Sequence, residues 1–178
     1  MAVCKAHQVH PLPERLSFAQ GAAIHVPYAT AWRAVIQRAR AERGETILVH
    51  GASGAVGLAA VQMAHAAGLT VIGTAGTAEG AALVRTQGAD HALNHREAGY
   101  LNQLALLTSG EPDIVIEMLA NQNLDHDLAL IARHGRIVIV GNRGRVEIDP
   151  RRIMGKEATV MGMAFWNMTE DDLSRIHA

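Results

Sequence analysis

Short apolar runs alternate with longer stretches of helical spacing along most of the chain. Six apolar runs predict buried strands, at residues 46–50, 70–73, 91–93, 113–117, 136–140 and 158–162. The stretches between them predict helices over residues 55–67, 78–87, 100–107 and 124–132. Continuously apolar strands that alternate with helices are typical of a parallel sheet with both faces covered. The predicted fold class is therefore α/β: a doubly wound, six-stranded parallel sheet in the order 3-2-1-4-5-6, with helices on both faces.

A further helix is predicted ahead of the first strand, within residues 14–41. Ser17 is expected to cap its N-terminus, because a serine side chain can accept a hydrogen bond from a free N–H of the first turn. Pro27 lies well inside this alanine-rich stretch. Because proline lacks an N–H and its ring clashes with the preceding turn, we expect the helix to bend or break there.

Composition and charge exclude several classes of protein. A hydrophobic fraction of 49% in 178 residues suits one domain with a real core. The net charge of −1, from 16 basic and 17 acidic residues without a basic block, argues against nucleic-acid binding. Cys4 is the single cysteine, so we expect no disulfide framework, no thiolate zinc site and a reducing, cytoplasmic compartment. The sequence shows no signal peptide and no apolar stretch of membrane-spanning length, so no membrane partner is expected.

A glycine-rich turn, HGASGAVG at residues 50–57, directly follows the first predicted strand and opens a helix. In a dinucleotide-binding Rossmann fold, such a turn holds a pyrophosphate against the free N–H groups at the start of the helix. Gly54 would let the backbone approach the pyrophosphate, and Gly57 would let the helix pack close to the strand. Ala52 occupies the first glycine position of the usual pattern, which is a departure from it. A purely structural turn of small residues is the alternative interpretation.

The end of the second strand indicates which dinucleotide the turn would hold. An NAD site usually has an acidic residue there, which bonds the ribose 2′-hydroxyl. Here the strand ends in GTAGT, and no acid follows before Glu79 in the next helix. Thr74 and Thr77 can offer hydrogen bonds to a 2′-phosphate, and His95 and Arg96 can offer positive charge. These features favour NADP(H) as the cofactor, with a solvated loop at His95 and Arg96 as the alternative.

Several further motifs accompany the turn, and together they span nearly the whole chain. They are QGAAI at residues 20–24, PYATA at 27–31, VHGASGAVG at 49–57, GTAGT at 73–77, NHRE at 94–97, IEMLAN at 116–121 and VGNRG at 140–144. With these motifs the chain resembles the zeta-crystallin type of quinone oxidoreductase, a zinc-independent branch of the medium-chain dehydrogenase/reductase superfamily. The resemblance implies an NADPH-dependent enzyme that transfers hydride directly to a quinone or an α,β-unsaturated carbonyl.

The resemblance also implies roles for individual cofactor-binding residues. The residues that would line the pyrophosphate are Ser53, Gly54, Ala55 and Val56, next to Gly57. Gly76 and His95 would lie by the adenosine ribose phosphate, with Thr77 and Arg96 close by. Those on the nicotinamide side would be Asn121, Asn123, Val140, Gly141 and Asn142, with Thr30 as a further candidate. All but Thr30 follow the carboxyl ends of predicted strands, where open α/β sheets bind their ligands.

No catalytic residue and no metal site are predicted. The ten histidines are scattered, without helical ligand spacing beside a matching carboxylate. Asp113 and Glu117 flank the fourth strand and are interpreted as polar strand ends rather than as an acid–base pair. This agrees with the resemblance, since in that family the cofactor carries the chemistry.

Members of the family carry an N-terminal, GroES-like catalytic domain, which this sequence lacks. We therefore expect residues 1–178 to form one NADP(H)-binding domain, with residues 1–15 as the junction to the catalytic domain. The family's closing segment after the sixth strand is expected to be missing too. Two alternatives are a non-catalytic NADPH-binding or interaction module and an enoyl reductase domain of a polyketide synthase. The apolar sixth strand, residues 158–162, would be a sheet edge that pairs in a homodimer.

Overall fold

A computed structural model describes residues 3–4, 9–107 and 111–177 of the chain. Part of the predicted junction, residues 1–2 and 5–8, lies outside these ranges. No helix within them is both long and apolar enough to cross a bilayer.

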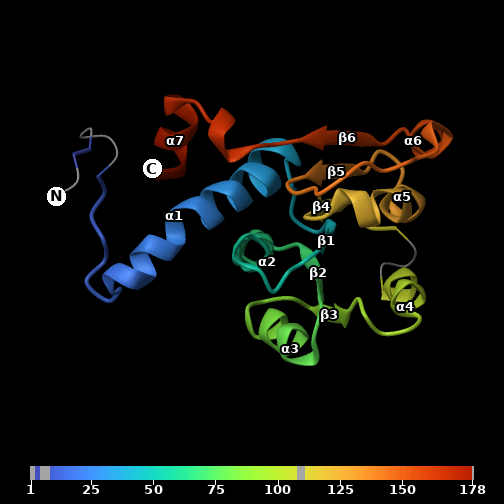
Figure 1. Ribbon diagram of the computed structural model, residues 1–178, viewed down its shortest axis with the longest axis horizontal. Helices are drawn as coiled ribbons and strands as arrows, with labels where there is room; N and C mark the ends of the chain where they lie inside the picture. The colour runs from blue at the N-terminus through green and yellow to red at the C-terminus, as the bar shows by residue number, and fades with distance from the viewer. Residues whose placement is uncertain (1–2, 5–8, 108–110, 178) are drawn as a thin grey trace.

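Six parallel strands form one sheet, which confirms the predicted fold class. Their order is β3-β2-β1-β4-β5-β6, and in Figure 1 they stack from β6 at the top to β3 at the bottom. Each lies within two residues of its predicted bounds. The strands are β1 (Thr46–Val49), β2 (Thr70–Ala75), β3 (His91–Asn94), β4 (Ile114–Glu117), β5 (Arg136–Ile139) and β6 (Thr159–Gly162).

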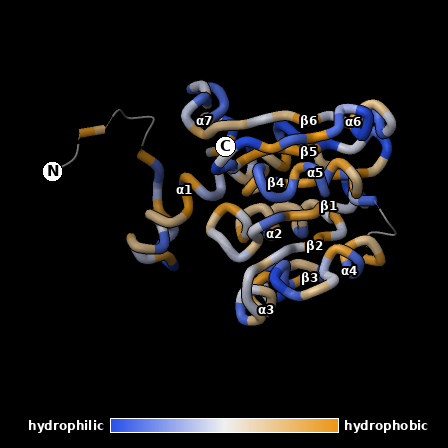
Figure 2. Tube along the Cα trace, turned by 45° about the vertical axis from the view of Figure 1, so that its right-hand side comes forward, coloured by the Kyte–Doolittle hydropathy of each residue, from blue (hydrophilic) through white to orange (hydrophobic). Residues whose placement is uncertain are grey.

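Helices cover both faces of this sheet, so its central strands are apolar on both sides. One face carries α1 (Phe18–Trp32), α2 (Ala55–Ala67) and α3 (Ala78–Thr86); the other carries α4 (Tyr100–Leu107), α5 (Ala120–Leu130) and α6 (Pro150–Lys156). Successive strand residues point to opposite faces. Ile47 and Val49 accordingly join one core cluster and Leu48 joins the other, all fully buried. In Figure 2 the hydrophobic colour follows the strands between the helix layers.

The helix before β1 does not break at Pro27, so of the two expected outcomes, a bend or a break, the break does not occur. Ser17 caps α1 as expected: its hydroxyl accepts the N–H of Gln20 at 3.2 Å, and the Gln20 side chain accepts the N–H of Ser17 at 2.9 Å. The helix then runs through Pro27 and continues as a π-helix, η2 (Arg33–Arg38). The carbonyl left without a donor by Pro27 belongs to Ala23, which is exposed. Water can satisfy that carbonyl, which lowers the cost of a proline inside the helix.

Some elements near the C-terminus lie outside the predicted set. The helix α6 begins with Asp149 as its cap and Pro150 in its first turn, a local signal that sequence analysis overlooked. After β6 the chain forms η3 (Phe165–Asn167) and α7 (Glu170–His177), although the sequence led us to expect that the family's closing segment would be absent. A hydrogen bond of 2.5 Å from Gln37 to Asp172 joins α7 to η2. The helix α7 therefore packs back near the N-terminal helix (Figure 1).

Candidate functional site

The glycine-rich turn between β1 and α2 is closely packed backbone. Gly51 has a φ of +58°, in the left-handed region that glycine adopts without strain. A Cβ on Gly57 would overlap the carbonyl oxygen of Gly51 and lie 2.6 Å from the Cα of Ala52. Ala52 occupies the first glycine position of the pattern, and its methyl group fits because the facing residue on β2, Gly73, has no side chain. A Cβ on Gly73 would lie 2.9 Å from the Ala52 methyl. Glycine is therefore needed at Gly57 for helix packing.

The helix α2 begins at this turn without a side-chain cap. Its N-cap is Gly54, which has no side chain to accept a hydrogen bond from the first turn. The N–H groups of Ala55, Val56 and Gly57 come before the first intrahelical bond, which Leu58 donates to Gly54. These N–H groups and the positive end of the helix dipole make the turn suitable for an anion. Ser53 flanks the same spot.

Gly76, His95 and Arg96 meet at the carboxyl ends of β2 and β3. A Cβ placed on Gly76 would lie 3.4 Å from both the Nε2 of His95 and the Nε of Arg96. Burial, Arg96 and His50 lower the pKa of His95, so its ring is mainly neutral at pH 7. The fixed positive charge here is therefore that of Arg96. Thr77 caps α3, since its hydroxyl accepts the N–H of Gly80 at 3.0 Å.

Asn121 and Asn142 join the loop after β5 to the first turn of α5. The side-chain oxygen of Asn142 accepts the N–H of Asn121 at 3.0 Å, and the side-chain oxygen of Asn121 accepts the N–H of Arg143 at 3.0 Å. Close by, a Cβ on Gly141 would overlap the Met118 carbonyl. The helix α5 begins four residues before the predicted start because these partners, distant in sequence, satisfy its first N–H groups. Asn121 thus lies in a helix and not in a loop.

The remaining predicted residues lie at three separate places. Val140 follows β5 and packs partly buried against the core on the α2 side. Asn123, in α5, instead lines a cavity together with His95. Thr30 is buried in α1.

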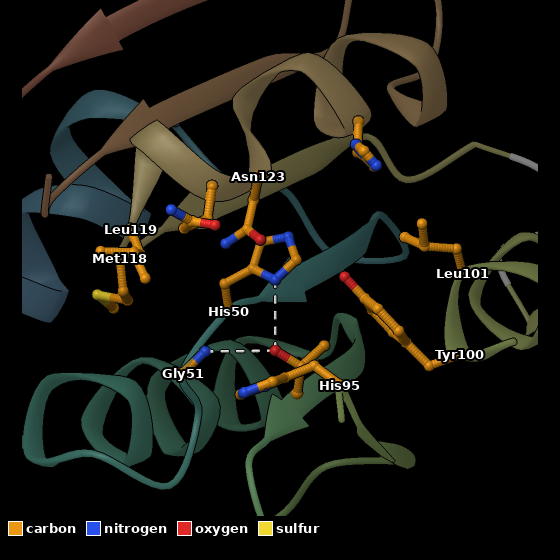
Figure 3. Close-up of a pocket in the computed structure, with 11 residues that line it drawn as sticks. His50, Gly51, His95, Tyr100, Leu101, Met118, Leu119 and Asn123 are labelled. Atoms are coloured by element: carbon orange, nitrogen blue, oxygen red, sulfur yellow. Dashed lines mark hydrogen bonds between the residues drawn. The ribbon is translucent and has the colours of Figure 1, made fainter. Parts of the chain in front are cut away.

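This cavity, of about 550 Å³, is at the carboxyl ends of β1 to β4 (Figure 3). Tyr100 and Leu101 enclose it from α4, while α5 supplies a second wall. Its lining residues are His50, Gly51, Thr74, His95, Tyr100, Leu101, Met118, Leu119, Gln122, Asn123 and His126.

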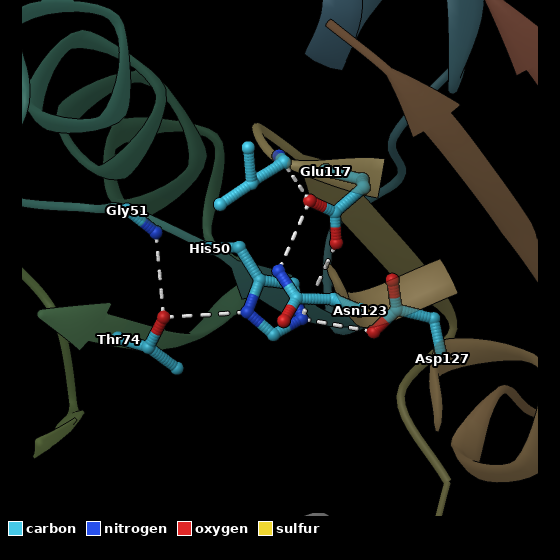
Figure 4. A network of polar contacts seen from close by, with 7 residues as sticks. His50, Gly51, Thr74, Glu117, Asn123 and Asp127 are labelled. Atoms are coloured by element: carbon cyan, nitrogen blue, oxygen red, sulfur yellow. Dashed lines mark hydrogen bonds and ion pairs between the residues drawn. The ribbon is translucent and has the colours of Figure 1, made fainter. Parts of the chain in front are cut away.

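A buried polar network forms the floor of the cavity (Figure 4). The Nε2 of His50 lies 2.9 Å from Asp127 Oδ1 and 3.7 Å from Glu117 Oε2, and its Nδ1 lies 3.3 Å from the hydroxyl of Thr74. Glu117 Oε1 accepts hydrogen bonds from the N–H of Leu119 and, at 3.2 Å, from the side-chain amide of Asn123. These groups come from the residue after β1 and from β2, β4 and α5, so the network ties four parts of the fold together.

The protonation states in this network depend on burial and on one another. Burial and Asp127 together raise the pKa of Glu117 to about 7, against the opposing effect of His50. Burial lowers the pKa of His50, but the charge and hydrogen bond of Asp127, together with Glu117, outweigh this and raise it above its ordinary value. Below about pH 7 the side chain of Glu117 is therefore mainly protonated, and the carboxyl groups next to His50 favour the protonated form of its ring.

Sequence analysis missed this network. His50 and Asp127 are 77 positions apart, and Glu117 was interpreted as a polar strand end. That interpretation suits Asp113, which accepts the N–H of Thr46 at 2.8 Å, but Glu117 is fully buried. One local signal was present, because Asp127 falls on the apolar face of α5, next to the buried Leu128. The three potential ligand atoms of His50, Glu117 and Asp127 lie within 4.8 Å of one another, a grouping that the prediction of no metal site did not foresee.

Comparisons with known proteins agree with the motifs. The zinc-binding dehydrogenase family matches residues 55–177. The chain is 47% identical over 178 residues to the quinone oxidoreductase of Homo sapiens, a match that covers 99% of this chain and 54% of that protein. The chain thus spans about half the length of the relatives it matches.

Solved structures of similar proteins share this fold. The quinone oxidoreductase of Thermus thermophilus, whose complex with NADPH is known, matches with a TM-score of 0.82 and 34% identity, over 94% of this chain and 54% of that one. The Escherichia coli quinone oxidoreductase complexed with NADPH matches with a TM-score of 0.84 and 28% identity, over 96% of this chain and 54% of that one. The sequence motifs, the strand order and these likenesses agree, and the chain belongs to the zinc-binding dehydrogenase family, with quinone oxidoreductases among its relatives.

Proposed function

We propose that this chain is the NADP(H)-binding domain of an NADPH-dependent quinone oxidoreductase. The whole protein would reduce a quinone or a related α,β-unsaturated carbonyl. When bound, NADPH supplies the hydride, from C4 of its nicotinamide. The 47% identity to a quinone oxidoreductase over the full chain supports this assignment, as do two similar structures crystallised with NADPH.

The observation that carries the cofactor assignment is the cluster of Gly76, His95 and Arg96. A 2′-phosphate there would meet the guanidinium of Arg96 and a ring N–H of His95, and no acidic residue lies between the end of β2 and Glu79. Arginine suits this role because its planar group donates two parallel hydrogen bonds to phosphate oxygens. The site therefore favours NADP(H) over NAD(H).

The other parts of the cofactor would follow the carboxyl edge of the sheet. The pyrophosphate would lie at the N–H groups of Ala55 and Val56, beside Ser53. The adenosine would extend toward the 550 Å³ cavity, past His95. The nicotinamide would lie toward the loop after β5, which Asn121 and Asn142 hold in place. In this arrangement the residues of the chain bind and orient the cofactor rather than transfer protons.

Calorimetric titration of the chain with NADPH and with NADH tests this proposal. NADPH should bind more tightly, and Arg96→Gln should weaken NADPH binding by about tenfold, the effect of losing a charge-assisted hydrogen bond, while leaving NADH nearly unchanged. Gly54→Val should weaken both dinucleotides, because its side chain would cover the N–H groups of the turn.

Arg43→Gln is the matched control, because Arg43 is an exposed arginine that precedes β1, at the amino ends of the strands and so at the end of the sheet opposite the proposed cofactor site. It should leave both affinities unchanged. Equal binding of NADPH and NADH, with no effect of Arg96→Gln, would contradict the cofactor assignment. Failure to bind either dinucleotide would favour the non-catalytic interaction module.

We also propose that the protein is a cytoplasmic homodimer, joined by antiparallel pairing of β6 with its copy. This strand is the last in the sheet order, and Val160 and Met161 make it apolar and only partly buried. An apolar edge of this kind favours pairing with another chain. Light scattering that finds a monomer at high protein concentration would rule the dimer out. A cytoplasmic location is consistent with the single cysteine, Cys4.

A further inference from the structure

Two buried carboxylate oxygens beneath the cavity have no hydrogen-bond donor. They are Glu117 Oε2 and Asp127 Oδ2, and within the described parts of the chain no group donates to either of them. Both residues are almost fully buried, with exposed fractions of 0% and 1%. A buried polar atom that is left without a partner is costly, because water cannot replace the missing bond. These oxygens therefore indicate a partner that the protein itself does not supply, either a cation or a shared proton.

The geometry around His50 brings these oxygens to one point. Glu117 and Asp127 both lie at the Nε2 side of the His50 ring, away from Thr74 (Figure 4). The Nε2 is 2.9 Å from Asp127 Oδ1 and 3.7 Å from Glu117 Oε2, and one ligand atom of each residue lies within 4.8 Å of the other two. Two atoms bound to the same zinc ion at about 2.0–2.2 Å are separated by roughly 3–4 Å. Small rotations of the carboxyl groups would therefore suffice to hold an ion.

The surrounding hydrogen bonds leave the ligand atoms free. Glu117 Oε1 accepts the N–H of Leu119 and, at 3.2 Å, the side-chain amide of Asn123, so Oε2 is the oxygen left over. When Nε2 of His50 binds a metal, the ring proton is on Nδ1, and the hydroxyl of Thr74 at 3.3 Å can accept it. Histidines that bind metals donate their other N–H in this way, and carboxylates that bind metals are themselves hydrogen-bonded.

The donor set selects the type of ion. It offers one imidazole nitrogen and three carboxylate oxygens, if Asp127 binds through both of its own, which gives the four ligands usual for structural zinc. Imidazole suits Zn²⁺ and other transition metals, whereas Mg²⁺ and Ca²⁺ prefer oxygen alone. A divalent ion would also neutralise the two buried carboxylates. The expectation of no metal site rested on helical spacing, but these three residues come from different elements.

We propose that His50, Glu117 and Asp127 bind one divalent transition-metal ion, for which Zn²⁺ is the best fit. The ion would join the residue after β1 to β4 and α5. Its role would be structural, because neither carboxylate is among the residues that line the cavity, so a ligand there does not meet the ion. The proposal therefore does not rest on the proposed function.

Calorimetric titration of the full chain with a zinc salt, after removal of bound metals with a chelator, tests the proposal. Wild type should bind one Zn²⁺ ion tightly. Asp127→Asn and Glu117→Gln keep the shape of each side chain, and each should weaken this site about a hundredfold or more, since loss of a group outside the ligands already costs 10–100-fold. Asn123→Ala removes the donor to Glu117 Oε1 and should weaken the site about tenfold. Circular dichroism would verify that each variant is folded.

Two matched controls address zinc bound at the surface. Asp125→Asn removes an acid of the same helix that pairs with Arg152 at the surface, at 3.0 Å. His65→Gln removes an exposed histidine of α2. Both should bind Zn²⁺ like wild type. If Asp127→Asn also binds like wild type, the ion binds elsewhere and the inference is overturned. Absence of tight binding to wild type would overturn it too, and would leave a shared proton as the partner of the two oxygens.

Two further readouts examine the ion itself. Zn²⁺ should raise the Tm of wild type but not of Asp127→Asn, because an ion that binds only the folded state stabilises it. Excess Mg²⁺ should not compete with Zn²⁺, since Mg²⁺ has little affinity for the imidazole of His50. Equal binding of Mg²⁺ would show that His50 is not a ligand and would overturn the inference. A zinc-induced rise in Tm that is the same in both proteins would overturn it as well.

Discussion

Replacement of Gly57 by alanine tests whether close backbone packing at the glycine turn stabilises the domain. The added Cβ would lie 2.6 Å from the Cα of Ala52 and would overlap the Gly51 carbonyl oxygen. Carbon atoms in contact are separated by about 3.5–4.0 Å, so the turn or the helix must move by about 1 Å. Hydrogen bonds from Ala52 to Thr74, at 2.7 Å, and from Gly54 to Gly51, at 3.0 Å, resist that movement.

Two opposing effects determine the magnitude. Overpacking costs about 1–3 kcal/mol, and overlap with backbone atoms on a hydrogen-bonded turn places this case near the upper end. Alanine in place of glycine in a helix returns about 1 kcal/mol. We therefore expect Gly57→Ala to lower the free energy of unfolding by about 2 kcal/mol. In a chain of this length that corresponds to a fall in Tm of about 4–8 °C.

Urea unfolding followed by circular dichroism measures this effect. Gly155→Ala is the matched control, because Gly155 lies in α6 and a Cβ there meets nothing within 4 Å. It should leave stability unchanged or raise it by up to about 1 kcal/mol. If the two variants unfold at the same urea concentration, the close approach at Gly57 does not limit stability, and the reasoning fails.

Two further predictions concern the buried network and the start of α5. The pKa of Glu117 is raised from 4.5 to about 7, so the wild-type protein should lose stability as pH rises across that interval, because the fold disfavours the ionised carboxylate. Glu117→Gln should flatten this decline. If the urea midpoints of the two proteins change with pH in the same way, the prediction is contradicted. Asn142→Ala should cost about 1 kcal/mol through loss of the cap on Asn121, whereas Asn142→Asp should retain it. Hydrogen exchange of the Asn121 amide would show the loss, and equal protection in both variants would refute the capping role.

The sequence by itself determined the sheet and the glycine turn, because both depend on local patterns. Burial on two faces requires runs such as Ile47, Leu48 and Val49, and a run of this kind is visible without knowing its partners. The turn is likewise local, since Gly51, Ala52 and Gly57 lie within seven positions. The family resemblance also led us to expect Gly76 and His95 beside the same ribose phosphate, and in the structure the carboxyl ends of their neighbouring strands do meet at one edge.

Tertiary structure decided the features that depend on partners far along the chain. The start of α5 was predicted too late because its cap, Asn142, lies 21 residues after Asn121. Pro27 was expected to bend or break α1, but the helix continues through it, because a helix tolerates proline where the freed carbonyl is exposed to water. The buried network joins His50, Glu117 and Asp127 across β1, β4 and α5, and each of these residues alone resembles an ordinary polar position. A sequence gives the chemistry of each group, but burial and mutual distance set its charge, and both arise only when the strands and helices pack.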